Sequence, residues 1–169
     1  MGGTDSTTFS PNATTTRGMI VTVLYRLTGE PASGTASQFT DVAAGAWYAK
    51  AVAWAASRDI VNGTSATTFS PNSPIPREQL AVIFDPYAQD QGWDVSAWPD
   101  WRLYRDAVQV SDYATQALAW AVGAGLITGT TDTTLSPRGS ATRAQVAVIL
   151  TRFCETVMPD GPVSHQEMV

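Results

Sequence analysis

The stretch Gly129-Thr-Thr-Asp-Thr-Thr-Leu-Ser-Pro-Arg-Gly-Ser-Ala-Thr-Arg143 is one of three copies of a single pattern in this 169-residue chain. The other two copies run from Gly63 to Arg77 and from Gly3 to Arg17, and each covers 14 steps from its glycine to its arginine. Each copy leads into an apolar pattern with helical spacing. A motif that recurs at fixed spacing indicates a repeat architecture, in which neighbouring units bury one another's apolar faces.

The apolar residues around these loops predict two helices per complete unit. The second helix of each unit carries a stripe at i, i+3, i+4 and i+7, and the first helix combines bulky aromatic residues with alanines. The second-helix stripes are Ile20, Val23, Leu24 and Leu27; Leu80, Ile83, Phe84 and Tyr87; and Val146, Ile149, Leu150, Phe153 and Val157. The first-helix stripes are Trp47, Ala51, Trp54 and Ala55, and Tyr113, Ala117, Trp120 and Ala121.

The threonine-rich loops have strand-like composition, but they do not alternate polar and apolar residues, and Ser-Pro interrupts each copy. We therefore expect turns instead of strands. The predicted fold class is all-α, with helix-loop-helix units whose apolar stripes pack together.

The repeats divide the chain into five parts. Residues 1–29 form the second half of a unit, and residues 39–88 and 104–158 form two complete units. Residues 89–103 are an inter-repeat insertion rich in tryptophan, and residues 159–169 are a polar tail that we expect to fray.

Two local features of the middle of the chain lead to specific expectations. The insertion contains Trp93, Trp98 and Trp101, and we expect it to pack against the bundle, with a sugar-binding platform as the alternative. Pro86 interrupts the second helix of the middle unit, so we expect that helix to end or kink near Asp85.

Composition excludes several classes of function. A net charge of −5 and a pI near 4.6 argue against a nucleic-acid partner. No apolar run approaches the ~18 residues of a membrane helix, so no membrane insertion is expected. With one cysteine (Cys154) and one histidine (His165), the chain has no internal disulfide and no candidate metal or nucleophile–base set, so we expect no cofactor and no enzyme activity.

The start of the chain has no charged-then-apolar leader, and the repeat pattern begins in the middle of a unit. We therefore expect a fragment of a longer, exported protein.

Arginine occupies the first turn of all three second helices, at Arg17, Arg77 and Arg143. A cation there opposes the helix dipole at a cost of roughly 0.3–1 kcal/mol. Capping by Thr16, Thr142 and Gln145 explains why the helices begin, but it does not explain the arginines.

Two explanations for the arginines remain open. Each arginine could pair with an acidic residue of a neighbouring unit, such as Asp41 or Asp106. Alternatively, the guanidinium and the free N–H groups of the helix N-terminus could together hold a carboxylate or phosphate.

With these residues in view, the chain resembles the S-layer homology repeat. The middle unit carries Phe39-x-Asp41-Val42, Trp47, Ala51, Trp54, Ile60-Val61-x-Gly63, Phe69-x-Pro71 and Pro76-Arg77-Glu78-Gln79. The last unit carries Tyr104-x-Asp106, Trp120, Gly125-Leu126-Ile127-x-Gly129, Pro137 and Thr142-Arg143-Ala144-Gln145. The first unit matches from Gly3 onward.

The resemblance implies a pseudo-threefold, three-pronged array around a central helix bundle, and a non-catalytic anchoring role at the bacterial cell wall or S-layer. Grooves between the prongs would bind the secondary cell-wall polysaccharide of Gram-positive bacteria, or a peptidoglycan-linked glycan, often through a pyruvylated sugar. The resemblance assigns to these grooves Arg17, Arg77, Arg143, Trp47, Tyr113, Asp41, Asp106, Gln79 and Gln145. The alternative is a protein-interaction or self-assembly module, in which another chain completes the half-unit and forms a homo-oligomer.

The first two units depart from the family pattern. The first unit lacks its first helix and has Gly18-Met19 where the motif has Ala-Glu, so a groove that needs this part is expected to be open. In the middle unit, Pro76 replaces the capping threonine and removes its hydroxyl.

Overall fold

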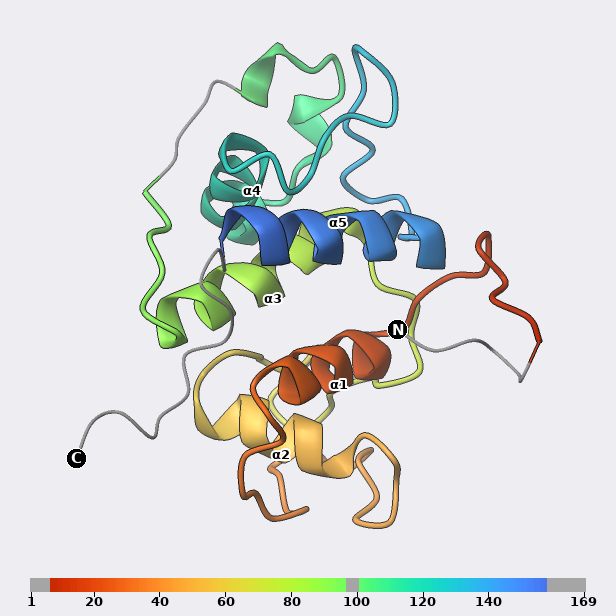
Figure 1. The fold of residues 1–169 in the computed structure, drawn as a ribbon, viewed down its shortest axis with the longest axis vertical. Coiled ribbons are helices and arrows are strands. Elements are labelled where there is room, and N and C mark those ends of the chain that lie inside the picture. Colours follow the sequence, from red (N-terminus) through yellow and green to blue (C-terminus); the bar gives the residue numbers. More distant parts are fainter. Residues whose placement is uncertain (1–6, 97–100, 158–169) are drawn as a thin grey trace.

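The computed structural model describes residues 7–96 and 101–157, and its helices follow the order of the repeats (Figure 1). No β-strand occurs in these two ranges, which confirms the all-α class and the assignment of the threonine-rich loops to turns. The elements are α1 (Arg17–Leu27), α2 (Ala49–Ser57), α3 (Arg77–Asp90), the 3₁₀-helices η1 (Trp101–Leu103), η2 (Ala107–Gln109) and η3 (Asp112–Ala114), α4 (Thr115–Gly123) and α5 (Arg143–Thr156).

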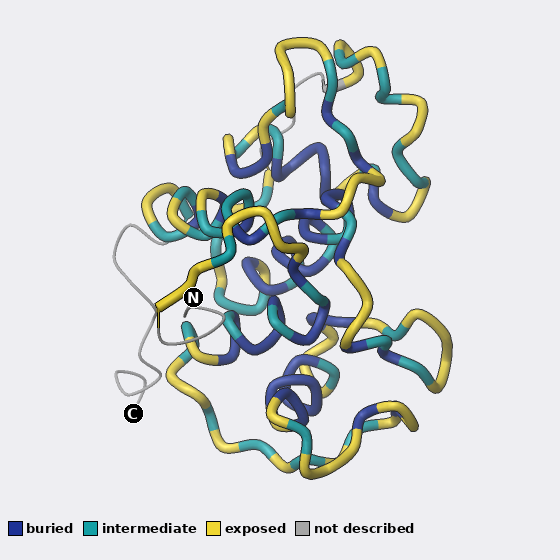
Figure 2. Tube along the Cα trace, turned by 90° about the vertical axis from the view of Figure 1, so that its right-hand side faces the viewer, coloured by how far each residue is buried: buried dark blue, intermediate teal, exposed yellow. Residues whose placement is uncertain are grey.

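The second helices of the three units, α1, α3 and α5, form the centre of the molecule, with α3 lying between the other two in Figure 1. α2 packs against α1, and α4 packs against α3. Figure 2 shows buried segments gathered where the helices meet, with exposed loops around them. The central apolar side chains are almost fully buried: Ile20, Leu24, Leu80, Ile83, Tyr87, Val146, Ile149 and Phe153.

A closed ring of backbone hydrogen bonds joins the three units immediately before their second helices. The N–H of Thr15 donates to the carbonyl of Ala141, that of Ala141 to Ile75, and that of Ile75 to Thr15, each at 2.9 Å. All three residues are fully buried. Because each of them stands two positions before its unit's arginine, the ring has the pseudo-threefold symmetry that the family resemblance implies.

The helix N-termini are capped as the sequence indicates. The Thr16 side chain accepts a hydrogen bond from the Met19 N–H at 3.4 Å. Thr142 and Gln145 form a complete capping box, with both bonds at 3.2 Å. Pro76 occupies the N-cap of α3 without a side-chain bond, and the first N–H groups of α3 donate to the Gly139 and Pro137 carbonyls of the last unit.

The expectation that the middle second helix ends near Asp85 is wrong, and the alternative of a kink at Pro86 stays a prediction. α3 continues through Pro86 to Asp90. Proline removes one helical hydrogen bond at a cost of about 3 kcal/mol. Beyond it, however, the side chains of Tyr87 and Ala88 are fully buried, and burial of an aromatic side chain offsets a cost of that size.

The expectation that Trp47 and Tyr113 belong to the apolar face of the first helices is also wrong. α2 begins at Ala49 and α4 at Thr115, so both aromatic residues precede their helix. Each is 60% exposed. The alanines and the central tryptophan of each helix bury its apolar surface, which leaves these two rings available at the molecular surface.

The insertion packs against the bundle through Trp93, as its aromatic content predicts. The centroid of the Trp93 ring lies 5.9 Å from that of Tyr87 and 5.6 Å from that of Phe153. Trp98 and the tail 159–169 lie outside the described residues, and Trp101 is placed by its backbone as the first residue of η1.

Candidate functional site

Arg17 reaches from the start of α1 into the loop of the next unit. Its Nε donates to the Phe69 carbonyl and its Nη2 to the Asn62 carbonyl, both at 2.9 Å. The guanidinium also lies 4.6 Å from the centroid of the Phe69 ring. Burial lowers the pKa of Arg17, opposed by Tyr113 and Asp41, but an arginine stays protonated in proteins. A buried cation therefore joins the first two units.

The other two arginines repeat this connection around the ring. Arg77 donates from Nε to the Leu135 carbonyl at 3.0 Å and from Nη2 to the Thr128 carbonyl at 2.6 Å. Arg143 donates from Nε to the Phe9 carbonyl at 2.8 Å, and its guanidinium lies 4.9 Å from the Phe9 ring centroid. The third unit is thereby joined back to the first.

The first N–H groups of these helices are already occupied by the neighbouring loop, which overturns the idea that they are free to bind an anion. In α1, the N–H of Arg17 donates to the Ser73 carbonyl at 3.1 Å and that of Gly18 to the Pro71 carbonyl at 2.9 Å. α3 and α5 make the equivalent pairs of bonds to the loops of the last and first units. Any ligand must be recognised by side chains.

Asp41 and Asp106 do not form ion pairs with Arg17 or Arg77 among the described residues, so the first of the two open explanations does not hold for these two arginines. Their carboxylates instead accept backbone N–H groups of their own unit's loop. Asp41 accepts from Phe69 at 2.8 Å and from Ser70 at 2.7 Å.

Asp106 repeats this pattern in the last unit, where it accepts from Leu135 at 2.8 Å and from Ser136 at 2.7 Å. Ser70 and Ser136 both precede a proline and have φ values of 57° and 53°, which are uncommon for residues with a side chain. The aspartates therefore stabilise strained turns. Backbone carbonyls of these turns accept hydrogen bonds from Arg17 and Arg77.

These contacts lead to a prediction about pH. Partial burial would raise the pKa of Asp41 and Asp106, but the bonds from the loop N–H groups, helped by Arg17 and Arg77, lower it below the ordinary value. A carboxylate with a lowered pKa stabilises the fold above its unfolded pKa of about 3.9, and this contribution is lost as the pH falls through the folded pKa.

The melting temperature of the unaltered chain should therefore fall as the pH is lowered below about 4. The double variant Asp41→Asn, Asp106→Asn should melt lower at neutral pH and depend less on pH in the acid range, because a neutral carboxamide does not titrate. Circular dichroism melts from pH 7 to pH 2.5 measure both effects. Parallel pH profiles for the two chains would contradict this role of the aspartates.

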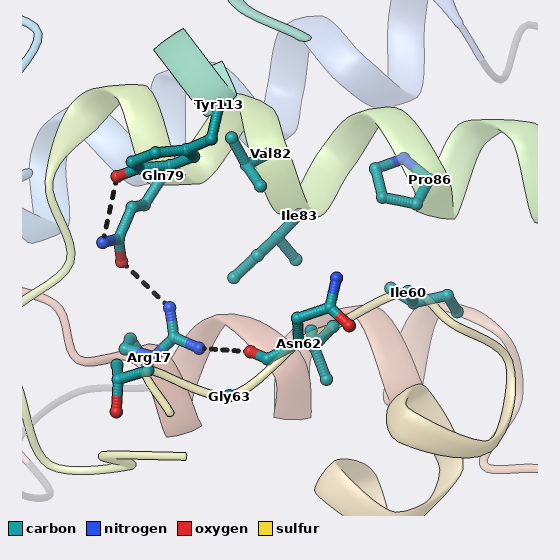
Figure 3. Close-up of a pocket in the computed structure, with 11 residues that line it drawn as sticks. Arg17, Ile60, Asn62, Gly63, Gln79, Val82, Ile83, Pro86 and Tyr113 are labelled. Atoms are coloured by element: carbon teal, nitrogen blue, oxygen red, sulfur yellow. Dashed lines mark hydrogen bonds between the residues drawn. The ribbon is translucent and has the colours of Figure 1, made fainter. Parts of the chain in front are cut away.

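A cleft of about 520 Å³ lies between α1, α3 and η3, and Figure 3 shows its lining. We call it the first cleft; it is lined by Arg17, Ile60, Val61, Asn62, Gly63, Thr64, Gln79, Val82, Ile83, Pro86 and Tyr113. None of these residues is acidic. The apolar side chains of Val82, Ile83 and Pro86 form one part of the wall, and polar groups form another.

The polar wall of the first cleft is a chain of hydrogen bonds from one unit to the next. Gln79 Oε1 accepts from Arg17 Nη1 at 2.9 Å, and Gln79 Nε2 donates to the Tyr113 hydroxyl at 3.4 Å (Figure 3). The Tyr113 hydroxyl in turn donates to Glu78 at 3.3 Å. The carboxylate of Glu78, which is 3% exposed, also accepts from the N–H and hydroxyl of Ser111 at 2.9 and 2.8 Å. These contacts orient one cation, one amide and one phenol toward the same space.

A second cleft, of about 310 Å³, lies at the equivalent place between the middle and last units. It is lined by Arg77, Thr128, Gly129, Thr130, Ala144, Gln145, Val148, Ile149 and Arg152. Its lining contains no aromatic residue, and Arg152 stands where the first cleft has Pro86. Gln145 caps α5 here, whereas Gln79 bridges an arginine and a tyrosine.

The structure thus brings Arg17, Gln79 and Tyr113 together in the first cleft, and Arg77 and Gln145 in the second. Four other expected site residues line neither cleft: Arg143, Trp47, Asp41 and Asp106. Sequence reasoning missed three contributors, Asn62, Thr128 and Glu78. Asn62 and Thr128 accept hydrogen bonds through their backbone carbonyls. The sequence cannot indicate this role, because every residue type has a carbonyl. Glu78 was quoted as part of the motif, but nothing in its spacing indicated that it receives Ser111 and Tyr113.

Within the described residues, no helix is both long and apolar enough to cross a membrane. Nor does that part of the chain gather three histidine, cysteine, aspartate or glutamate side chains as a metal site would require.

Several known proteins are similar in sequence to this chain. The chain is 32% identical over 165 residues to the Surface-layer 125 kDa protein of Lysinibacillus sphaericus, covering 95% of this chain and 13% of that protein. It is 30% identical over 167 residues to an Endoglucanase of Bacillus sp. (strain KSM-635), covering 99% and 18%. It is 29% identical over 152 residues to the Amylopullulanase of Thermoanaerobacterium thermosulfurigenes, covering 88% and 8%. The chain thus spans less than one fifth of each of these relatives.

The model of the S-layer homology domain matches residues 38–81 and 103–147, which is more than half of the chain. The two matched segments contain the loops of the middle and last units with Asp41, Asp106, Arg77 and Arg143, whereas Arg17 and the first loop lie outside them. With the closed ring of three units and these two matches, the chain belongs to the S-layer homology domain family.

Proposed function

We propose that this chain is a non-catalytic module that anchors a protein to the bacterial cell surface by binding an anionic, pyruvylated wall polysaccharide in the clefts between its units. The observation that carries the proposal is the first cleft, where Arg17, Gln79 and Tyr113 converge on an open space beside an apolar wall.

The chemistry of the first cleft suits a sugar that bears a carboxylate. A pyruvyl ketal supplies that carboxylate, and Arg17, a buried cation joined to Gln79, supplies the matching charge. Tyr113, with 60% of its surface exposed, offers an aromatic face to the apolar side of a sugar ring. Val82, Ile83 and Pro86 fit the methyl group of the ketal, because they form an apolar patch within reach of the same space.

The relatives support a surface location. One is named as a surface-layer protein and two are named as polysaccharide-degrading enzymes, and this chain matches only a small part of each. A module shared by proteins with such different names suits a role in attachment. We therefore place this chain outside the cell, at the wall or S-layer, and assign catalysis to none of its residues.

The clefts are not equivalent, and we propose that the first cleft is the main binding site. The second cleft lacks an aromatic wall, and its glutamine is occupied as a helix cap. Arg143 joins the last unit to the first, where Met19 stands at the position of Gln79 and offers no amide.

Binding to cell walls with and without the ketal tests the proposed function. Mild acid removes pyruvyl ketals and leaves the glycan backbone in place. The folded chain is expected to co-sediment with native Gram-positive walls and to bind about tenfold less, or worse, to acid-treated walls. Equal binding to both preparations would contradict recognition of the carboxylate, and no binding to either would contradict the anchoring role.

A further inference from the structure

The polar wall of the first cleft has a fixed direction of hydrogen bonding, because its two ends differ in character. At one end Arg17 Nη1 donates to Gln79 Oε1 at 2.9 Å, and a guanidinium can only donate. At the other end the Tyr113 hydroxyl donates to Glu78 Oε1 at 3.3 Å, and an ionised carboxylate can only accept. With its oxygen on the arginine, Gln79 presents Nε2 to the Tyr113 hydroxyl, at 3.4 Å (Figure 3). Each group between the two ends therefore has one orientation.

Glu78 is the group on which this chain of hydrogen bonds ends. It lies in the first turn of α3, where the helix dipole favours a negative charge, and it is 3% exposed. Its carboxylate accepts two hydrogen bonds from Ser111 and one from Tyr113. It forms no ion pair with any of the described residues. A buried carboxylate thus ends the chain of hydrogen bonds that begins at the buried cation of Arg17.

The other two units have no counterpart of Glu78. The residue after the first-turn arginine is Gly18 in α1 and Ala144 in α5, and neither carries a side-chain acceptor. In the second cleft, Gln145 uses its oxygen to cap α5. The directed chain of hydrogen bonds is therefore a property of the first cleft and not of the repeat.

The donors and acceptors that the polar wall leaves open define what a ligand must offer. Arg17 gives one N–H each from Nε, Nη1 and Nη2 to protein oxygens, and the second N–H of Nη1 and of Nη2 has no partner among the described residues. Gln79 likewise keeps one N–H of Nε2. Tyr113 has given its only proton to Glu78, so its oxygen can only accept a further hydrogen bond.

We propose that Glu78 determines both the direction of the ligand in the first cleft and its need for a hydrogen-bond donor, an inference that rests on the proposed function of this cleft. The ligand carboxylate binds at the end formed by Arg17 and Gln79, where only donors are open. Beside Tyr113 the ligand presents a sugar hydroxyl or amide N–H. A ligand with an acceptor at this end binds more weakly, because two acceptors then face each other without a proton.

Glu78→Gln reverses the polarity of the wall with almost no change of shape. The Ser111 N–H still requires an oxygen, so the new amide turns its NH₂ group to Tyr113, whose proton is then free to point into the cleft. Affinity for isolated native wall polysaccharide, measured by titration calorimetry, should fall about tenfold. Tyr113→Phe removes the acceptor and keeps the ring, and it should cause a loss of the same size. Unchanged affinity of either folded variant would overturn the proposal.

Two further variants separate this role from a general loss of stability. Glu78→Gln combined with Tyr113→Phe should bind as weakly as either single variant, because both changes act on one hydroxyl. Ser111→Ala removes a different hydrogen bond of Glu78, so its affinity should stay within about twofold of the unaltered chain. An additive loss of about a hundredfold in the double variant, or a loss of about tenfold for Ser111→Ala, would overturn the role of the hydroxyl.

The direction of the Tyr113 hydroxyl can also be measured without a ligand. In a chain labelled with ¹³C at tyrosine Cζ, the Tyr113 signal is the one of five that Tyr113→Phe removes. A phenol that donates to a carboxylate has its Cζ signal displaced toward that of a phenolate, so Glu78→Gln should move this signal back, whereas Ser111→Ala should not. An unmoved signal in folded Glu78→Gln would overturn the proposal. If the unaltered chain bound no polysaccharide, the proposed function would fail, and this signal would still decide the direction of the hydroxyl.

Discussion

Gly63→Ala and Gly129→Ala are each expected to lower the free energy of unfolding by about 3 kcal/mol or more. A Cβ at Gly63 would lie 2.2 Å from the Ser65 carbonyl oxygen and 2.4 Å from that of Thr68. At Gly129 it would lie 2.2 Å from the Thr131 carbonyl oxygen. These neighbours are backbone atoms, so relief requires the loop to open.

Opening the loop would break other contacts, because hydrogen bonds within the loop and contacts with the neighbouring unit both stabilise it. In the middle unit, the Thr64 N–H donates to the Thr68 carbonyl at 2.8 Å, and Phe39 packs beside the glycine. The same loop presents the carbonyls that Arg17 binds. A methyl group at this point therefore disturbs both the loop and the junction between units.

Gly45→Ala is the matched control, since a Cβ there would meet nothing within 4 Å. Its free energy of unfolding should stay within about 0.5 kcal/mol of the unaltered chain. Urea denaturation followed by tryptophan fluorescence measures all three variants. If Gly63→Ala were as stable as Gly45→Ala, the close packing of the loop described here would be wrong.

Arg17→Met and Arg77→Met are each expected to lower the free energy of unfolding by about 2–4 kcal/mol. Methionine keeps much of the apolar length of the side chain but removes the donors. Each arginine is buried, at 6% and 5% exposed, and gives two hydrogen bonds to backbone carbonyls of the next unit. Hydrogen bonds from a charged donor contribute more than neutral ones, and the carbonyls would lose their partners.

Arg26→Met is the control for removing a charge from the same helix. Arg26 is paired with Glu30 at 3.7 Å, with both side chains more than 60% exposed, and such surface pairs contribute about 0–1 kcal/mol. The same denaturation experiment compares the three variants. If Arg17→Met and Arg77→Met destabilised the chain no more than Arg26→Met, the hydrogen bonds of Arg17 and Arg77 to the next unit would not stabilise the fold.

Much of the fold follows from the sequence because the repeat, the caps and the apolar stripes are local patterns. Thr16 and Thr142 cap the helices as predicted, and the stripes on α1, α3 and α5 meet in the core. The sequence does not predict that α3 continues through Pro86. Burial of Tyr87 beyond the proline is a tertiary effect, and it outweighs the local tendency of proline to end a helix.

The site was harder to predict than the fold. Repetition singled out the arginines, but their partners are the carbonyls of Phe69, Asn62, Leu135 and Thr128, and every residue type has a carbonyl. The resemblance to S-layer homology repeats supplied Gln79 and Tyr113, and the structure shows that the two meet each other and Arg17. The first-turn cation is thus explained without an acidic partner.

The central claim is that the first cleft binds the wall polysaccharide, and the affinity of the double variant Gln79→Ala, Tyr113→Ala tests it most directly. Both side chains are at least partly exposed and outside the core, so the variant should fold, and Val108→Ala, at a 91% exposed position that does not line the cleft, is the control. Titration calorimetry with isolated native polysaccharide should show about a tenfold or greater loss of affinity for the double variant and none for the control. Unchanged affinity in a folded double variant would contradict the assignment of the site.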